Sequence, residues 1–154
     1  MKKVNVNNFK KTLSKFSTGI TVVCVKNNNL IYGKTVNSFN SLSLNPPMVL
    51  FSLGNYSSSI NQFSKTKFLS INILSSKQKK LSNYFASTNP DLNKINFIEG
   101  KNKTAIIPNC IANLECKLTD KIKKGDHIIF ICKIIELQFN DNLKPLIYFN
   151  SKYF

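Results

Sequence analysis

The chain of 154 residues contains no arginine, no tryptophan and only five glycines. All 22 basic residues are therefore lysines, and with seven acidic residues the formal net charge is +15. Arginine is the side chain that best recognises phosphates and guanine edges, and the lysines are scattered in short groups. We therefore interpret the charge as a solvated surface shaped by compositional bias, which attracts anionic ligands, and we expect no nucleic-acid partner.

Long hydrophobic runs are also missing. No apolar segment approaches the ~18 residues of a membrane-spanning helix, and the first residues lack the apolar stretch of a signal peptide. We expect a soluble, cytoplasmic protein with no membrane partner. Hydrophobic residues make up 42% of the chain, which is enough for a folded core, and the length suits a single domain over residues 1–154.

Metal sites and nucleophilic catalysis lack their usual patterns. The four cysteines form no C-x-x-C pair, and there is one histidine, so we expect no metal site and interpret the cysteines as reduced and structural. G-x-S-x-G, G-x-G-x-x-G and P-loop motifs are absent. If the protein is an enzyme, we expect a cofactor to supply the chemistry. The residues concerned are Cys24, Cys110, Cys116, Cys132 and His127.

The hydrophobic pattern predicts a mainly β protein with short helices. About seven strands at hairpin-like spacing favour a β-barrel with helical additions. A hairpin turn is expected at 27–29, and an irregular loop over 91–108. The predicted strands cover residues 20–25, 30–36, 48–53, 68–74, 110–118, 127–139 and 146–149, and the predicted helices cover 7–16, 57–63 and 77–85.

Three features are candidates for ligand binding. The polar stretch 35–43 continues a strand, and its small side chains either bond a planar polar ring or pair with the chain's own backbone. The serines at 57–59 begin a helix, where hydroxyl and N–H groups can hold an anion, although serine caps are common. His127 either bonds to its turn or faces a cofactor or substrate.

Taken together, these stretches resemble the flavin reductase family, whose members are FMN-binding split-barrel proteins. The sequence F-S-T-G-I-T-V-V at 16–23 is similar to the family's F-x-T-G-V-x-V-V, and G-K-T-V-N-S-F-N-S-L-S-L-N-P-P at 33–47 is close to its G-x-T-x-N-S-F-x-S-x-S-x-x-P-P. The strand at 68–74, the G-D-H at 125–127 and the P-L-I-Y-F at 145–149 also resemble family motifs. The five pieces occur in order along nearly the whole chain.

The resemblance implies a homodimeric FMN-binding split β-barrel, with FMN or FAD near the subunit interface. Its implied activity is that of an NAD(P)H:flavin oxidoreductase. A hydride passes from NADH or NADPH to FMN or FAD, and the reduced flavin serves a partner monooxygenase. The residues implied by resemblance are Thr35, Val36, Asn37 and Ser38 at the isoalloxazine ring, Ser41 at the ribityl chain, Ser57, Ser58, Ser59 and Lys94 at the phosphate, and His127, as catalytic residue, with Tyr148 beside it at the nicotinamide.

Three other functions stay open at this point. A flavin-binding split barrel with little reductase activity is favoured by Cys132, where the family usually has glycine, and by Asn150 in the closing motif. A protein similar to pyridoxamine-phosphate oxidases would share the architecture. A basic nucleic-acid-binding β-barrel would place aromatic residues among basic ones, whereas the phenylalanines here lie mostly on apolar strand faces.

Overall fold

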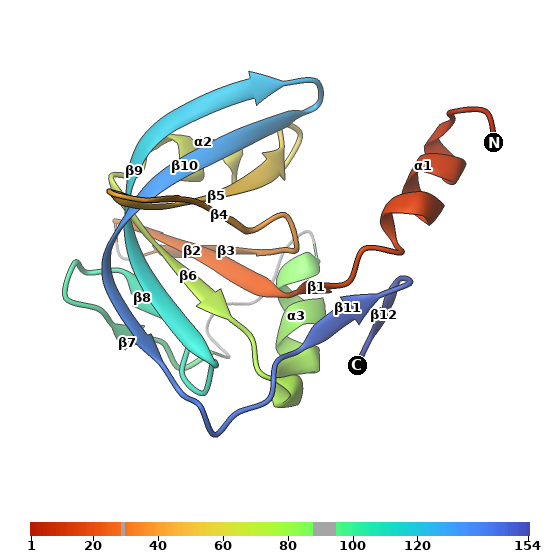
Figure 1. Cartoon of the computed structure of the whole chain (residues 1–154). Helices are drawn as coiled ribbons and strands as arrows, with labels where there is room; N and C mark the ends of the chain where they lie inside the picture. Colours follow the sequence, from red (N-terminus) through yellow and green to blue (C-terminus); the bar gives the residue numbers. More distant parts are fainter. Residues whose placement is uncertain (29, 88–94) are drawn as a thin grey trace.

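The computed structural model describes residues 1–28, 30–87 and 95–154. Short helices are interspersed among β-strands along the chain (Figure 1). The elements in chain order are α1 (Val6–Leu13), β1 (Thr18–Gly19), β2 (Thr21–Asn27), β3 (Leu30–Val36), β4 (Asn40–Leu44), β5 (Pro47–Gly54), α2 (Ile60–Lys65), β6 (Phe68–Ile73), the 3-10 helix η1 (Ser76–Gln78), α3 (Lys79–Ala86), β7 (Ile98–Glu99), β8 (Ala105–Ile106), β9 (Ala112–Lys124), β10 (His127–Phe139), β11 (Ile147–Phe149) and β12 (Lys152–Tyr153).

Seven antiparallel strands form one sheet in the order β3-β2-β6-β9-β10-β5-β4. The sheet curls until β3 contacts β5 (Figure 1). Within the described residues no hydrogen-bonded strand pair closes that seam, because β3 and β4 are the two edges of the sheet. The result is a split β-barrel with short helices, which confirms the fold class predicted from the sequence.

Aromatic side chains fill the inside of the barrel. Phe51 of β5 stacks on Phe130 of β10 with ring centroids 5.1 Å apart, and Phe63 of α2 meets both rings edge-on. All three side chains are fully buried, and burial of each contributes ~1.5–3 kcal/mol. Phe63 thereby anchors α2 to the barrel and holds the loop between β5 and α2 in place.

A second core lies between the sheet and α3. Strand β2 is buried on both faces, because Val23 and Val25 face the barrel interior while Cys24 packs in the cluster around Phe85 of α3. The ring of Phe85 lies so close to Gly33 of β3 that a Cβ there would be 2.4 Å from it. Glycine at position 33 therefore permits this close approach of helix and strand.

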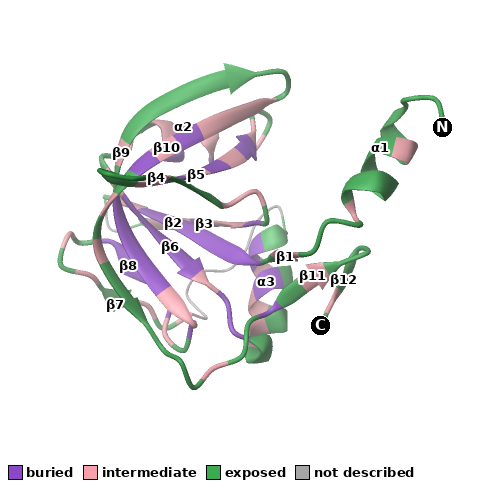
Figure 2. Cartoon of the chain, viewed as in Figure 1, coloured by how far each residue is buried: buried purple, intermediate pink, exposed green. Residues whose placement is uncertain are grey.

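The N-terminal helix α1 lies apart from the barrel (Figure 1), and none of its residues is buried (Figure 2). Its last turn is tied to the turn between β11 and β12. The N–H of Asn150 donates to the carbonyl of Ser14 at 2.7 Å, and the Lys15 ammonium donates to the Asn150 side chain at 2.9 Å. Strand β11 pairs with β1 and β12 in a separate three-stranded sheet.

Most of the predicted elements are confirmed. The strands at 30–36 and 127–139 have the predicted bounds, and the other predicted strands overlap observed ones, although β9 runs on to Lys124. The helix predicted at 7–16 is observed as α1 and ends earlier, at Leu13. In the predicted turn at 27–29, Asn28 has a φ of 49°, and Asn29 lies outside the described residues. None of the helices in the described ranges is long and apolar enough to cross a membrane.

The prediction of an irregular loop over 91–108 is wrong in its second half, where β7 and β8 pair as a small hairpin. The carboxylate of Glu115 on β9 holds this hairpin. It accepts hydrogen bonds from the N–H groups of Lys101 and Asn102, both at 2.9 Å, and from the Thr104 hydroxyl at 2.8 Å. The anchor lies on a different strand, so the local pattern that predicts loops does not contain it.

Candidate functional site

A cleft of about 430 Å³ opens where β3 and β5 end and β10 begins. This volume falls within the ~300–1,000 Å³ of typical ligand pockets. The loop between β5 and α2 forms a further wall. The fold thus brings together residues that the sequence predicted from three distant stretches, namely Thr35, Val36, Asn37, Ser38, Ser57, Ser58 and His127.

The hydroxyl groups at the end of β3 are bonded to neighbouring backbone. Thr35 donates to the carbonyl of Ser82 in α3 at 2.7 Å. The Ser38 hydroxyl donates to the Ser52 carbonyl at 3.1 Å and accepts from the Ser52 N–H at 3.0 Å. These bonds fix the strand end against α3 and β5. Asn37, which lies between Thr35 and Ser38 in the sequence, is exposed and lines the cleft.

Ser57 and Ser58 lie at the other wall of the cleft, whereas Ser59, also predicted as a site residue, is buried and is not among the described residues that line it. Ser57 is half-buried, Ser58 is exposed and Ser59 is buried. The hydroxyls of Ser57 and Ser59 are 3.3 Å apart. Ser59 is the N-cap residue of α2, but its side chain makes no capping hydrogen bond, so the expected serine cap is not made. The Ser59 hydroxyl therefore contacts the Ser57 hydroxyl at the cleft wall instead of capping the helix.

His127 is the first residue of β10, and its Cα partner across the sheet is Gly54 of β5. Its Nδ1 lies 2.7 Å from Oδ1 of Asp126. The hydrogen bond from His127, and next its charge, hold the pKa of Asp126 below its usual range. An ionised carboxylate only accepts hydrogen bonds, so the shared proton lies on Nδ1. The half-exposed ring therefore keeps Nε2 for a ligand.

Two predicted site residues lie elsewhere in the chain's fold. Ser41 does not line the cleft, because β4 turns back along β5 and pairs Ser41 with Val49, roughly 10–17 Å along the strand from the cleft residues at 52–54. Tyr148 does not line the cleft beside His127, because β11 pairs with β1 in the three-stranded sheet, where the Tyr148 ring lies 5.2 Å from that of Tyr153. Lys94 lies outside the described residues.

Several cleft residues were not predicted as site residues. Ser52, Leu53 and Gly54 enter through β5, and only the pairing of β5 with β10 brings them there. Lys34 and Tyr56 directly precede predicted stretches, so adjacency was a usable signal for these two. Ala86 comes from the end of α3. No aspartate or glutamate is among the described residues that line the cleft, which suits an anionic ligand.

The four cysteines are free and buried, in agreement with their interpretation as structural. Cys132 lies inside the barrel against Val49 of β5 rather than in the cleft. Burial raises the pKa of its thiol to about 12, and that of Cys110 to about 11. Cys132 therefore does not narrow the ligand cleft.

Comparisons with known proteins give a consistent result. Residues 13–154 match the family model described as "Flavin reductase like domain". The chain is 32% identical over 137 residues to "FMN reductase (NADH) SmoA" of Agrobacterium fabrum, covering 89% of this chain and 79% of the relative. It is 27% identical over 145 residues to the reductase component of a 4-nitrophenol 4-monooxygenase/4-nitrocatechol 2-monooxygenase of Rhodococcus opacus, covering 94% and 78%.

A solved structure with the same fold contains fragments of a nicotinamide dinucleotide and of a flavin dinucleotide. It is the Streptomyces globisporus NADH:FAD oxidoreductase SgcE6 in complex with NAD and FAD fragments. The TM-score is 0.92 at 25% sequence identity, and the alignment covers 99% of this chain and 95% of that one. The barrel described above is therefore an architecture in which a related protein holds such fragments.

Proposed function

The chain belongs to the flavin reductase-like domain family, and from this we infer that it is an NADH-dependent flavin reductase. It transfers a hydride from NADH to a flavin, and the reduced flavin serves a monooxygenase; relatives named as reductase components of monooxygenases support this. The observation that carries this inference is the family match over residues 13–154.

The described cleft fits a flavin by its chemistry. Ser57 and Ser58 bring hydroxyl groups to one wall and Asn37 brings an amide to another, and among the described residues Lys34 is the one lysine that lines the cleft and no carboxylate does so. A phosphate-bearing ring compound needs such donors and is repelled by carboxylates. The net charge of +15 adds a field that draws anions toward the protein.

We propose the following division of roles among the cleft residues. Ser57 and Ser58, with Ser59 behind them, bind the flavin phosphate through hydroxyl groups. The end of β3, from Thr35 to Ser38, lies along the ring, and the bonds of Thr35 and Ser38 to neighbouring backbone keep that strand end rigid. His127, oriented by Asp126, faces the nicotinamide through Nε2.

The chemistry itself requires little of the side chains. A bound flavin supplies the ring that accepts the hydride from the nicotinamide. The chain's own task is to hold two planar rings at near-attack distance and to exclude water. The absence of a nucleophile motif from the sequence agrees with a task of binding and orientation.

The first experiment mixes the purified protein with excess FMN and NADH without oxygen and follows the visible absorption of the flavin. We expect bleaching well above the uncatalysed rate, measured in the same mixture without protein. Bound flavin without bleaching would instead support a flavin-binding protein of little activity. Absence of any flavin binding would contradict the proposed function.

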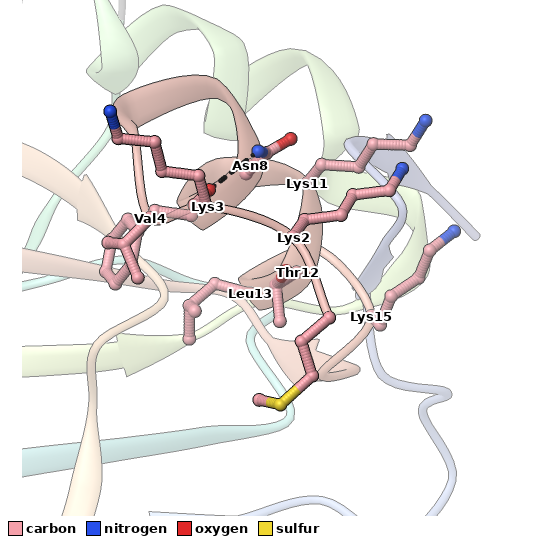
Figure 3. Close-up of a pocket in the computed structure, with 10 residues that line it drawn as sticks. Lys2, Lys3, Val4, Asn8, Lys11, Thr12, Leu13 and Lys15 are labelled. Atoms are coloured by element: carbon pink, nitrogen blue, oxygen red, sulfur yellow. Dashed lines mark hydrogen bonds between the residues drawn. The ribbon is translucent and has the colours of Figure 1, made fainter.

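We propose further that the protein is a homodimer in which a second copy covers α1. Phe9 and Leu13 of this helix are 59% and 52% exposed, and Phe16 just beyond it is 72% exposed. Apart from the bonds of Ser14 and Lys15 to Asn150, this short helix has little support, and helices of eight residues are marginal in water, so a partner that covers the apolar surface would stabilise it. Lys2, Lys11 and Lys15 extend to one side of the helix, whereas Val4 and Leu13 lie on the other, together with Lys3 (Figure 3). Two positively charged copies can thus meet without opposing Lys2, Lys11 and Lys15.

The position of α1 also relates the proposed dimer to the cleft. A groove leads from Leu13 and Phe16 past β1 to Asn37 and Ser38, and the last two also line the cleft. A copy seated on α1 would therefore lie next to the bound flavin. This supports the expectation of a flavin near the subunit interface.

Replacing Phe9 by alanine is expected to raise the dissociation constant of the dimer about tenfold, since a central aromatic contact contributes ~1–2 kcal/mol or more. Light scattering over a dilution series measures this. The matched control is Lys11→Ala on the lysine side of the same helix, which should leave the dimer unchanged. A parent protein that is monomeric and still binds flavin would contradict the shared interface.

A further inference from the structure

Tyr56 is an aromatic residue held at the rim of the cleft. It lies in the loop between β5 and α2 and is 80% exposed, although it lines the cleft. Its ring lies against Gly54, where an added Cβ would be 2.7 Å from Cζ and 2.8 Å from Cε1 of the ring. Glycine at position 54 therefore leaves the space that the tyrosine ring occupies.

The strand pattern shows which side of β5 carries this ring. Along β5 the side chains of Phe51 and Leu53 are buried in the barrel, so Ser52 and Gly54 face outward. Gly54 is the register partner of His127, and paired residues of antiparallel strands share a face. The Tyr56 ring therefore lies on the cleft side of the sheet, next to the serines at 57 and 58.

A large aromatic ring that is seated on backbone and left open to solvent can bind another planar group. The end of β3 lies at a different wall, so the wall nearest Tyr56 is that of the phosphate-binding serines. The part of a dinucleotide that extends beyond its phosphate is the adenosine, which FMN lacks. Stacking of a base on an aromatic side chain is favourable for any base and is worth roughly tenfold or more in affinity.

We propose that Tyr56 is a stacking platform for the adenine ring of a dinucleotide at this cleft. The inference rests on the proposed function and adds to it a residue that distinguishes ligands with adenine from those without it. Two dinucleotides of the reaction carry adenine, namely FAD and NADH, and the experiment separates them.

The test measures dissociation constants of FMN, FAD and NADH by fluorescence titration for the parent protein, Tyr56→Ala and Tyr56→Phe. Tyr56→Ala is expected to weaken an adenine ligand about tenfold and to leave FMN within twofold, while Tyr56→Phe keeps the ring and the parent affinities. Weaker binding of FAD would show that the ring stacks on the adenine of the flavin. Weaker binding of NADH alone would show that it stacks on the adenine of the nicotinamide dinucleotide. Equal weakening of FMN and FAD, or no weakening of any ligand, would overturn the proposal.

Gly54→Ala provides a second, independent variant, because it keeps the ring and displaces it. It should weaken the same adenine ligand, and it should add no further loss when combined with Tyr56→Ala. Full additivity of the two losses would overturn the seating of the ring on Gly54. A parent protein that binds neither flavin would overturn the proposed function itself, whereas flavin binding without an effect of Tyr56 overturns this inference alone.

Discussion

Replacing Ser57 and Ser59 together by alanine is expected to weaken FMN binding about 10- to 100-fold. Ser57 lines the cleft and the buried Ser59 supports its hydroxyl from behind, and a hydrogen bond from a neutral donor to a charged group contributes about 1.5–3 kcal/mol, which corresponds to roughly one to two orders of magnitude in affinity. The two hydroxyls are 3.3 Å apart. The double variant removes both, so no buried hydroxyl is left without its hydrogen-bond partner. The fold should persist, because Ser59 makes no capping bond and Phe63 still anchors α2.

A flavin titration with FMN and riboflavin checks this prediction. Riboflavin lacks the phosphate, so its affinity should change little. Ser64→Ala is a matched control, since Ser64 lies on α2 and does not line the cleft. If FMN binds the double variant as tightly as the parent protein, the phosphate assignment of these serines is wrong.

His127→Ala is expected to slow the reduction of bound flavin by NADH about 100-fold, while flavin affinity stays within threefold. The reason is positional, because loss of correct alignment between two reacting groups can cost ~100-fold in rate. The His127 ring is oriented by Asp126 at the rim of the cleft and does not belong to either buried core. Its removal should therefore leave the barrel stable.

Stopped-flow absorbance without oxygen measures the reduction rate directly, and a parallel titration gives the flavin affinity. Lys123→Ala is the control, because Lys123 is close to the same turn and does not line the cleft. Asp126→Asn should give an intermediate rate, since it weakens the bond that orients the imidazole. Equal reduction rates in His127→Ala and the parent protein would contradict a role at the nicotinamide.

Long strands with a clear local pattern could be predicted from the sequence, whereas short elements that depend on contacts with distant residues could not. Strands β3 and β10 were predicted with their observed bounds, because β-branched and aromatic residues dominate them and turn residues precede each of them. Strand β4 and the β7–β8 hairpin were missed. β4 depends on pairing with β5, and the hairpin depends on the carboxylate of Glu115, neither of which a local pattern contains.

The sequence by itself determined the fold class, the family and the stretches that carry ligand-binding residues. These properties depend on local alternation and on short motifs, such as the polar segment after β3 and the serines before α2, which can be recognised without knowing what lies beside them. The same information predicted that the cysteines are structural, and all four are buried and free.

Only the tertiary structure decided which of those residues meet. Pairing of β5 with β10 sets Gly54 against His127 and seats Tyr56 at the cleft, while β4 carries Ser41 away from it and β11 places Tyr148 in another sheet. The hydroxyls of Thr35 and Ser38, expected at the ring, are bonded to α3 and β5. The physical reason is that strand register joins segments tens of residues apart, and a motif specifies its own backbone but not its neighbour across the sheet.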